Sequence, residues 1–198
     1  RGCRAELSNP DLATYFGRLE LLPGEGAAAE VNLLAPSIAA QAAAHFDRGF
    51  FTTIDYGYEA PQLYAPWRKQ GTLLCFYNHG YSDSPYQRIG RQDITSHVDF
   101  TSLRNALPQW SLLLLTSQME FLHDLGINNA QQVGLPLEET MSRRRVAQEL
   151  LDPAGLGRLR VQVLARGVDR SEGSFQPLPG QGPRGVQPLP GAFPPGAH

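Results

Sequence analysis

The spacing of apolar side chains in the first half of the chain predicts a helix followed by a strand. Between residues 31 and 48, apolar side chains recur at the spacing of one helix face: Leu34, Ile38, Ala42 and Phe46. We therefore expect a helix that buries this face. Residues 50–54 are aromatic and β-branched and lie between glycines, which is typical of a strand buried on both faces in a mostly parallel sheet.

The following segments alternate between helix and strand patterns. Helices are predicted at residues 99–107, 119–125 and 138–151, and strands at 110–116 and 159–165. A long insert separates the first strand from the helix that begins at residue 99. This order favours the α/β class, as the second half of an α/β sheet.

The composition changes near the C-terminus. About half of residues 171–198 are proline or glycine, and Gln-Pro-Leu-Pro-Gly occurs twice, starting at Gln176 and Gln187. Such a segment cannot bury enough apolar surface to offset its ordering entropy. We expect a partial domain over residues 1–170 and a disordered tail over 171–198, with a polyproline ligand as the alternative role for the tail.

The charge and the cysteine content indicate which partners and which cellular compartment to expect. The formal net charge is −2, which favours neither a nucleic-acid partner nor a membrane surface. The two cysteines, Cys3 and Cys75, lack metal-type spacing and suit a reducing compartment, and no apolar run approaches the ~20 residues of a membrane span. We expect a cytoplasmic protein, and the start at Arg1 rather than methionine is typical of a fragment.

Acidic and imidazole side chains gather just before residue 100. Asp93, His97 and Asp99 are separated by even steps, so in an extended segment they would share one face. Such a group could accept a proton or grip a substrate, and we assign it as the candidate catalytic group. The structural alternatives are that Asp99 caps the following helix and that His97 bonds backbone in its loop.

Five further residues are candidate substrate-binding groups, each with a structural alternative. Asp55 follows the first strand, where open α/β sheets bind ligands, but it could equally close a turn. Tyr56 and Tyr58 could wall a pocket for a planar cation or pack against the insert. Glu30 could pair with a substrate guanidinium or with a nearby basic side chain. His79 lies in a sequence typical of an ordinary turn.

Several strings resemble one family when they are taken in order. They are Glu30-Val31-Asn32, Ile54-Asp55-Tyr56-Gly57-Tyr58, Gly71-Thr72-Leu73, His79 and Asp93-Ile94-Thr95-Ser96-His97-Val98-Asp99-Phe100. Their order and spacing resemble the MidA-like methyltransferases over roughly residues 22–167. The last string is far more specific than a lone glycine motif.

The resemblance implies a fold, a cofactor and a substrate. The family consists of class I enzymes with a Rossmann-like sheet that use S-adenosyl-L-methionine, and its mitochondrial members methylate protein arginine during assembly of respiratory complex I. This chain would then be the C-terminal half of such a sheet with a long insert. Its partner would be a protein substrate presenting an arginine side chain, and a eukaryotic parent would lie in the mitochondrial matrix.

The sequence departs from the family mainly in lacking two features that bind the methyl donor. The glycine-rich turn that approaches the methyl donor, and the acidic residue that holds its ribose, would lie upstream of Arg1. We therefore assign no cofactor-binding residue. We expect the chain alone to bind the donor poorly and to be inactive.

Two other functions remain open. A metal-dependent hydrolase could use His79, His97, Asp93 and Asp99 as ligands, although no helix-borne histidine pair at ligand spacing supports it and we assign no metal. A non-catalytic protein-binding module is the second alternative, because an incomplete sheet would leave an apolar edge that seeks a partner. The pattern does not predict an oligomeric state.

Overall fold

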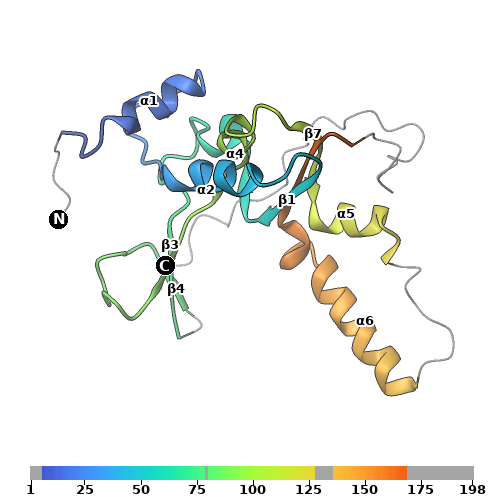
Figure 1. Cartoon of the computed structure of the whole chain (residues 1–198). Helices are drawn as coiled ribbons and strands as arrows, with labels where there is room; N and C mark the ends of the chain where they lie inside the picture. The colour runs from blue at the N-terminus through green and yellow to red at the C-terminus, as the bar shows by residue number, and fades with distance from the viewer. Residues whose placement is uncertain (1–5, 79, 128–135, 169–198) are drawn as a thin grey trace.

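The structure is a computed structural model that describes residues 6–78, 80–127 and 136–168 (Figure 1). Its helices are α1 Asp11–Arg18, α2 Leu34–Ala43, α3 Ala60–Leu63, α4 Phe100–Asn105, α5 Gln118–Asp124, α6 Leu137–Leu151 and the 3-10 turn η2 Leu156–Arg158. Its strands are β1 Gly49–Asp55, β2 Gly57–Tyr58, β3 Leu74–Tyr77, β4 Gly80–Ser82, β5 Asp93–Thr95, β6 Val98–Asp99, β7 Ser111–Ser117 and β8 Arg160–Arg166. The predicted tail at 171–198 lies outside these described residues.

The main sheet has the strand order β1-β8-β7, and β8 is antiparallel to both neighbours. Strands β1 and β7 therefore run in the same direction without being adjacent. The strand predicted at residues 50–54 is confirmed, but the expectation of a doubly buried strand in a mostly parallel sheet is wrong. Residues of β1 alternate between half-buried and exposed up to Ile54, because only one face of β1 is covered.

The larger core lies between that covered face and the helices α2 and α4. Its buried members are Ala39, Ala43, Phe100, Leu103, Leu107, Trp110 and Leu164. The rings of Phe51 on β1 and Trp110 meet edge to face with centroids 6.1 Å apart. These contacts hold α2 and α4 together on the sheet, as Figure 1 shows for the two helices.

Helix α2 turns a different face inward from the one predicted. The small side chains of Ala39 and Ala43 are buried, whereas Leu34, Ile38 and Phe46 are 70%, 62% and 56% exposed. Alanine allows α2 to approach α4 closely, which a row of large side chains would prevent. The helix begins later than predicted, at Leu34, because the Asn32 side chain accepts hydrogen bonds from the backbone N–H groups of its first two residues, and it ends earlier than predicted, at Ala43.

After the long insert, strand β6 lies beside β2, the short strand that follows β1. Strand β2 pairs in parallel with β6, which places Tyr58 opposite Asp99. This pairing needs glycine at position 57, because a Cβ there would lie 2.2 Å from the carbonyl oxygen of Val98. The strands β4, β3 and β5 form a separate sheet in that order, and the β3–β4 hairpin projects from the body in Figure 1.

A smaller core joins α1 to α3. Tyr15, Ala60, Leu63 and Tyr64 are buried there, and the rings of Phe16 and Tyr64 meet edge to face at 5.0 Å. Helix α1 is thereby fixed against the segment that follows β2. Within the described ranges, no helix is both long enough and apolar enough to cross a membrane.

Candidate functional site

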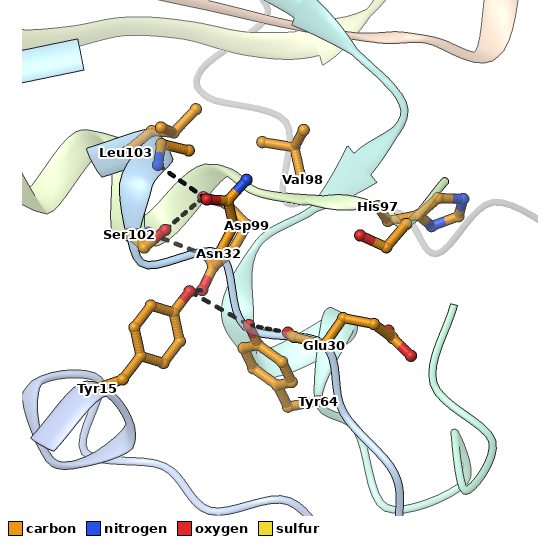
Figure 2. A pocket seen from close by; sticks show the side chains of 11 residues that line it. Tyr15, Glu30, Asn32, Tyr64, His97, Val98, Asp99, Ser102 and Leu103 are labelled. Carbon is orange, nitrogen blue, oxygen red and sulfur yellow. Dashed lines mark hydrogen bonds between the residues drawn. The ribbon is translucent and has the colours of Figure 1, made fainter. Parts of the chain in front are cut away.

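A small cavity lies where α1, the segment before α2, the end of α3, strand β6 and α4 meet (Figure 2). Its volume is about 50 Å³. Its polar lining comes from Tyr15, Glu30, Asn32, Tyr64, Ser96, His97, Asp99 and Ser102. The structure thus brings together three of the residues singled out from sequence, namely Glu30, His97 and Asp99.

Asp99 caps helix α4, so its structural alternative is confirmed. Its Oδ1 accepts hydrogen bonds from the backbone N–H groups of Thr101 at 2.9 Å and Ser102 at 3.1 Å. Its Oδ2 accepts a hydrogen bond of 2.7 Å from the hydroxyl of Tyr15, and the residue is buried. Both carboxylate oxygens are therefore engaged within the protein. The catalytic assignment of Asp99 stays a prediction.

Two tyrosines extend this hydrogen-bonded group, which we call the cap cluster: Asp99, Tyr15 and Tyr64. The hydroxyl oxygens of Tyr15 and Tyr64 lie 3.2 Å apart, and Tyr64 donates to the carbonyl oxygen of Glu30 at 3.3 Å. Burial raises the pKa of Tyr15 to about 12 and raises the pKa of Tyr64 well above its usual range. Both phenols therefore remain protonated at neutral pH and act as hydrogen-bond donors.

His97 belongs to a second group, an aromatic one. Its ring stacks with Tyr56 at a centroid distance of 6.4 Å and lies tilted against Tyr58 at 5.4 Å. Figure 2 shows the imidazole on the far side of the cavity from Tyr15. The Nδ1 atom of His97 is buried without a hydrogen-bond partner, while the backbone N–H donates to the Thr72 hydroxyl at 3.0 Å.

The surroundings keep the imidazole of His97 neutral. Burial, followed by the positive charges of Arg68 and Arg158, lowers the pKa of His97 to about 4, and the smaller opposing effects of Glu30 and Asp55 are already part of this value. At neutral pH the ring carries no charge. His97 can therefore accept a hydrogen bond through one ring nitrogen and donate one through the other.

Two arginines of the protein cover the tyrosine rings beside His97. The guanidinium carbon of Arg68 lies 4.9 Å from the ring centroid of Tyr58, and that of Arg158 lies 5.3 Å from the ring centroid of Tyr56. Each distance suits a cation–π contact. We call these five residues the His97 cluster: His97, Tyr56, Tyr58, Arg68 and Arg158. The two tyrosine rings that the sequence predicted as a site for a substrate cation therefore contact guanidinium groups of the protein itself.

Glu30 holds a turn of the insert. Its Oε2 accepts hydrogen bonds from the backbone N–H of Thr72 at 2.8 Å and from the Thr72 hydroxyl at 3.0 Å. Gly71 has a φ of +70°, and a Cβ there would lie 2.1 Å from Oε1 of Glu30. The contact between carboxylate and backbone therefore requires glycine at this position. The same turn supports the loop that carries His97, because the Thr72 hydroxyl accepts a hydrogen bond from the backbone N–H of His97.

The remaining candidates lie apart from the cavity. Asp55 is exposed at the end of β1, where its Oδ1 accepts a hydrogen bond of 2.7 Å from the backbone N–H of the next residue, Tyr56, and both of its predicted roles stay predictions. Asp93 is exposed on β5, opposite Phe76 in the small sheet. His79 lies outside the described residues.

The expectation that Asp93 shares one face with His97 and Asp99 is wrong. The extended run is broken between β5 and β6, and the two strands pair in different sheets. Even spacing predicts a common face only within one continuous strand. Among the residues that the structure describes, no group of three or more histidine, cysteine, aspartate or glutamate side chains could hold a metal ion.

Sequence reasoning missed Tyr15 and Arg158 as neighbours of the site. Tyr15 is 84 positions from Asp99 along the chain, and no local pattern links the two. Arg158 follows the helix α6 and reaches Tyr56 only through the folding of the main sheet. Neither contact leaves a signal in the spacing of residues.

The family model described as "Putative S-adenosyl-L-methionine-dependent methyltransferase" matches residues 3–115. This match spans more than half of the 198 residues, and the chain belongs to this family. No curated protein matches the chain significantly.

Two solved structures from Burkholderia thailandensis are similar. One is an uncharacterized COG1565 superfamily protein, with a TM-score of 0.69 and 31% identity, covering 79% of this chain and 44% of that chain. The other is a COG1565 superfamily member bound to S-adenosyl-homocysteine, with a TM-score of 0.69 and 28% identity, covering 82% of this chain and 43% of that chain. This chain therefore spans less than half the length of either protein.

Proposed function

We propose that this chain supplies the substrate-side part of an S-adenosylmethionine-dependent protein arginine N-methyltransferase. The observation that carries the proposal is the position of the His97 cluster. Tyr56 and Tyr58 follow directly from the C-terminal end of β1 and contact His97. Ligands of open α/β sheets bind beyond the carboxyl ends of strands. Because the chain belongs to a methyltransferase family, we interpret this position as the place where the methyl acceptor binds.

The described cavity does not fit the methyl donor. Pockets for ligands of drug size occupy roughly 300 Å³ or more, whereas this cavity measures about 50 Å³. A similar protein binds S-adenosyl-homocysteine, but this chain spans only 43% of it. The proposal therefore assigns donor binding to a part of the fold that this chain does not span, and gives the chain the acceptor side.

Arginine is the proposed acceptor because the His97 cluster already attracts guanidinium groups. The rings of Tyr56 and Tyr58 each carry one, at 5.3 Å and 4.9 Å. A substrate guanidinium would take the place of Arg68 over Tyr58, since that contact is a cation–π interaction of only about 0.5–2 kcal/mol. The rings would then hold the planar cation in one orientation, which is the main requirement for transfer to a chosen nitrogen.

His97 would act by orienting the acceptor. Methylation of a guanidinium nitrogen releases one proton, and the neutral imidazole can accept a hydrogen bond from that nitrogen. With a pKa of about 4, His97 is too weak a base to keep the proton at neutral pH, so the proton would pass on to solvent. Asp99, Tyr15 and Tyr64 would maintain the wall of the cavity, and Glu30 would hold the loop of His97 through Thr72.

The test uses a fusion that joins this chain to the part of the S-adenosyl-homocysteine-bound Burkholderia thailandensis protein outside the shared region. Mass spectrometry of an arginine-containing peptide after incubation with S-adenosylmethionine should show a mass gain on arginine. His97→Ala should abolish the gain while leaving S-adenosyl-homocysteine binding unchanged, and Asp93→Ala, which lies away from the cavity, should leave both unchanged. Methylation of lysine but not arginine would refute the arginine proposal, and unchanged turnover of His97→Ala would remove His97 from the site.

A non-catalytic protein-binding module is the second candidate. The favouring observation is that the chain spans less than half of either similar protein while leaving large apolar side chains of α2 exposed. A fusion that binds S-adenosyl-homocysteine but methylates no peptide would favour this candidate.

A further inference from the structure

Arg68 carries a half-buried guanidinium group that has no carboxylate partner. Its guanidinium carbon lies 4.9 Å from the ring centroid of Tyr58, and its Nε atom is buried without a hydrogen-bond partner. No ion pair between residues that the structure describes involves Arg68. Buried charges are normally paired, and arginine binds a carboxylate through two nitrogens at once. Arg68 therefore has an unused nitrogen that such a pair could use.

The neighbourhood of this guanidinium group has an excess of positive charge. A second guanidinium group, that of Arg158, lies over Tyr56, the other ring that contacts His97. Each of the two arginines lowers the pKa of His97 more strongly than the carboxylate of Glu30 or Asp55 raises it. The protein's own carboxylates therefore do not balance the two guanidinium groups at this place.

A substrate arginine would bring a third guanidinium group into the same neighbourhood. Under the proposed function it takes the place of Arg68 over Tyr58, so the side chain of Arg68 turns aside and its Nε atom becomes accessible. Like charges repel more strongly in a half-buried site than in water. A carboxylate that arrives with the substrate would offset this repulsion and give Arg68 the partner that it lacks.

We propose that Arg68 binds a carboxylate of the substrate, so that the site selects an arginine with aspartate or glutamate one or two positions away. The inference rests on the proposed function, because it takes the methyl acceptor to be arginine. The short spacing follows from the geometry: Arg68 covers a ring that contacts His97, and consecutive Cα atoms are only ~3.8 Å apart. The Nε–H group and a terminal N–H group of Arg68 would each donate to one carboxylate oxygen.

Two labelled peptides that differ only in carboxylate against amide groups test this preference. Each carries one arginine, and the two positions on either side of it hold aspartate in one peptide and asparagine in the other. Fluorescence anisotropy measures their binding to this chain. The aspartate peptide should bind at least about tenfold more tightly, which corresponds to about 1.4 kcal/mol. Added salt should reduce the difference, because it screens partly exposed charges.

Arg68→Gln should remove the preference, so that both peptides bind equally. Arg68→Lys keeps the charge but not the paired donors, and should retain part of the preference. Arg88→Gln is the matched control and should retain all of it, because Arg88 also covers a tyrosine ring, at 4.8 Å from the centroid of Tyr77, but on a strand of the separate small sheet. Partial unfolding of a variant lowers both affinities equally, so the ratio of the two affinities reports only on the carboxylate.

The outcomes separate the carboxylate site from the proposed function. Equal binding of the two peptides by the unchanged chain, or a preference that survives Arg68→Gln, would overturn the inference and leave the proposed function standing. A preference that depends on Arg68, for a peptide whose arginine the fusion never methylates, would support the carboxylate site and contradict the proposed function. Binding of neither peptide would contradict both.

The methyl donor is the other possible source of a carboxylate. S-adenosyl-homocysteine carries one, so its binding to the fusion is measured with and without Arg68→Gln. We expect the same affinity in both proteins. A loss of about tenfold or more in Arg68→Gln would assign the carboxylate to the donor and overturn the inference.

Discussion

Asp99 and His97 are two residues apart, yet their side chains enter different surroundings. Asp99 turns toward α4 and Tyr15, where three hydrogen bonds satisfy its carboxylate. His97 turns toward Tyr56 and Tyr58, where its buried Nδ1 has no partner. A group whose bonds are complete is suited to structure, whereas a buried polar atom without a partner is a candidate for contact with a ligand.

Asp99→Ala should destabilise the chain. It removes the cap of α4, a loss of about 1 kcal/mol, and leaves the buried Tyr15 hydroxyl without its acceptor, a further loss of about 1–3 kcal/mol. We expect urea denaturation to show a decrease of about 2–4 kcal/mol in the free energy of unfolding. Asp93→Ala, on an exposed strand, should change it by less than about 0.5 kcal/mol, and equal effects of the two substitutions would contradict the assigned role.

His97 should make stability depend on pH in the acidic range. Its pKa is about 4 in the folded protein and about 6.5 in the unfolded chain, so between these values the unfolded chain binds more protons. The contribution of neutral His97 is therefore complete above about pH 6.5 and is lost as the pH falls toward 4. Urea denaturation at pH 4.5 and 7.5 should show a smaller difference for His97→Gln than for the unchanged chain. An imidazole NMR signal of His97 that titrates near pH 6.5 would contradict this account.

Elements were predicted best where the pattern is local. The strands β1, β7 and β8 were predicted to within one residue at both ends, because short apolar runs between glycine and polar residues define them. The direction of pairing was not predictable, because an apolar run has the same composition in parallel and antiparallel sheets. The prediction of the buried face of α2 was wrong, because the spacing of residues reveals an apolar face but not which of two apolar faces packs into the core.

The short pairing of β2 with β6 should depend on glycine at position 57. Gly57→Ala would push a Cβ to within 2.2 Å of the Val98 carbonyl oxygen, so the strands would have to separate. We expect a loss of about 1–3 kcal/mol in the free energy of unfolding. Gly17→Ala on α1 is the control, because its Cβ would meet nothing within 4 Å and alanine favours a helix by up to about 1 kcal/mol. Equal stability of the two variants would contradict the close approach.

At the scale of the molecule, the site is assembled from distant segments. The sequence indicated Glu30 as a substrate-binding candidate and His97 and Asp99 as catalytic candidates, and all three line the cavity. Sequence reasoning could not anticipate the roles of Tyr15, Tyr64 and Arg158, which are set by tertiary contacts across α1, α3 and η2. The prediction that Asp93 shares a face with His97 and Asp99 was wrong, because even spacing along the sequence does not reveal a break in the strand.

Donor binding is the most direct test of the account that this chain is one part of a methyltransferase. S-adenosylhomocysteine is titrated by calorimetry into this chain alone and into the fusion with the Burkholderia thailandensis part. The account predicts binding by the fusion and none by the chain alone. Binding by neither protein, or equal binding by both, would contradict it.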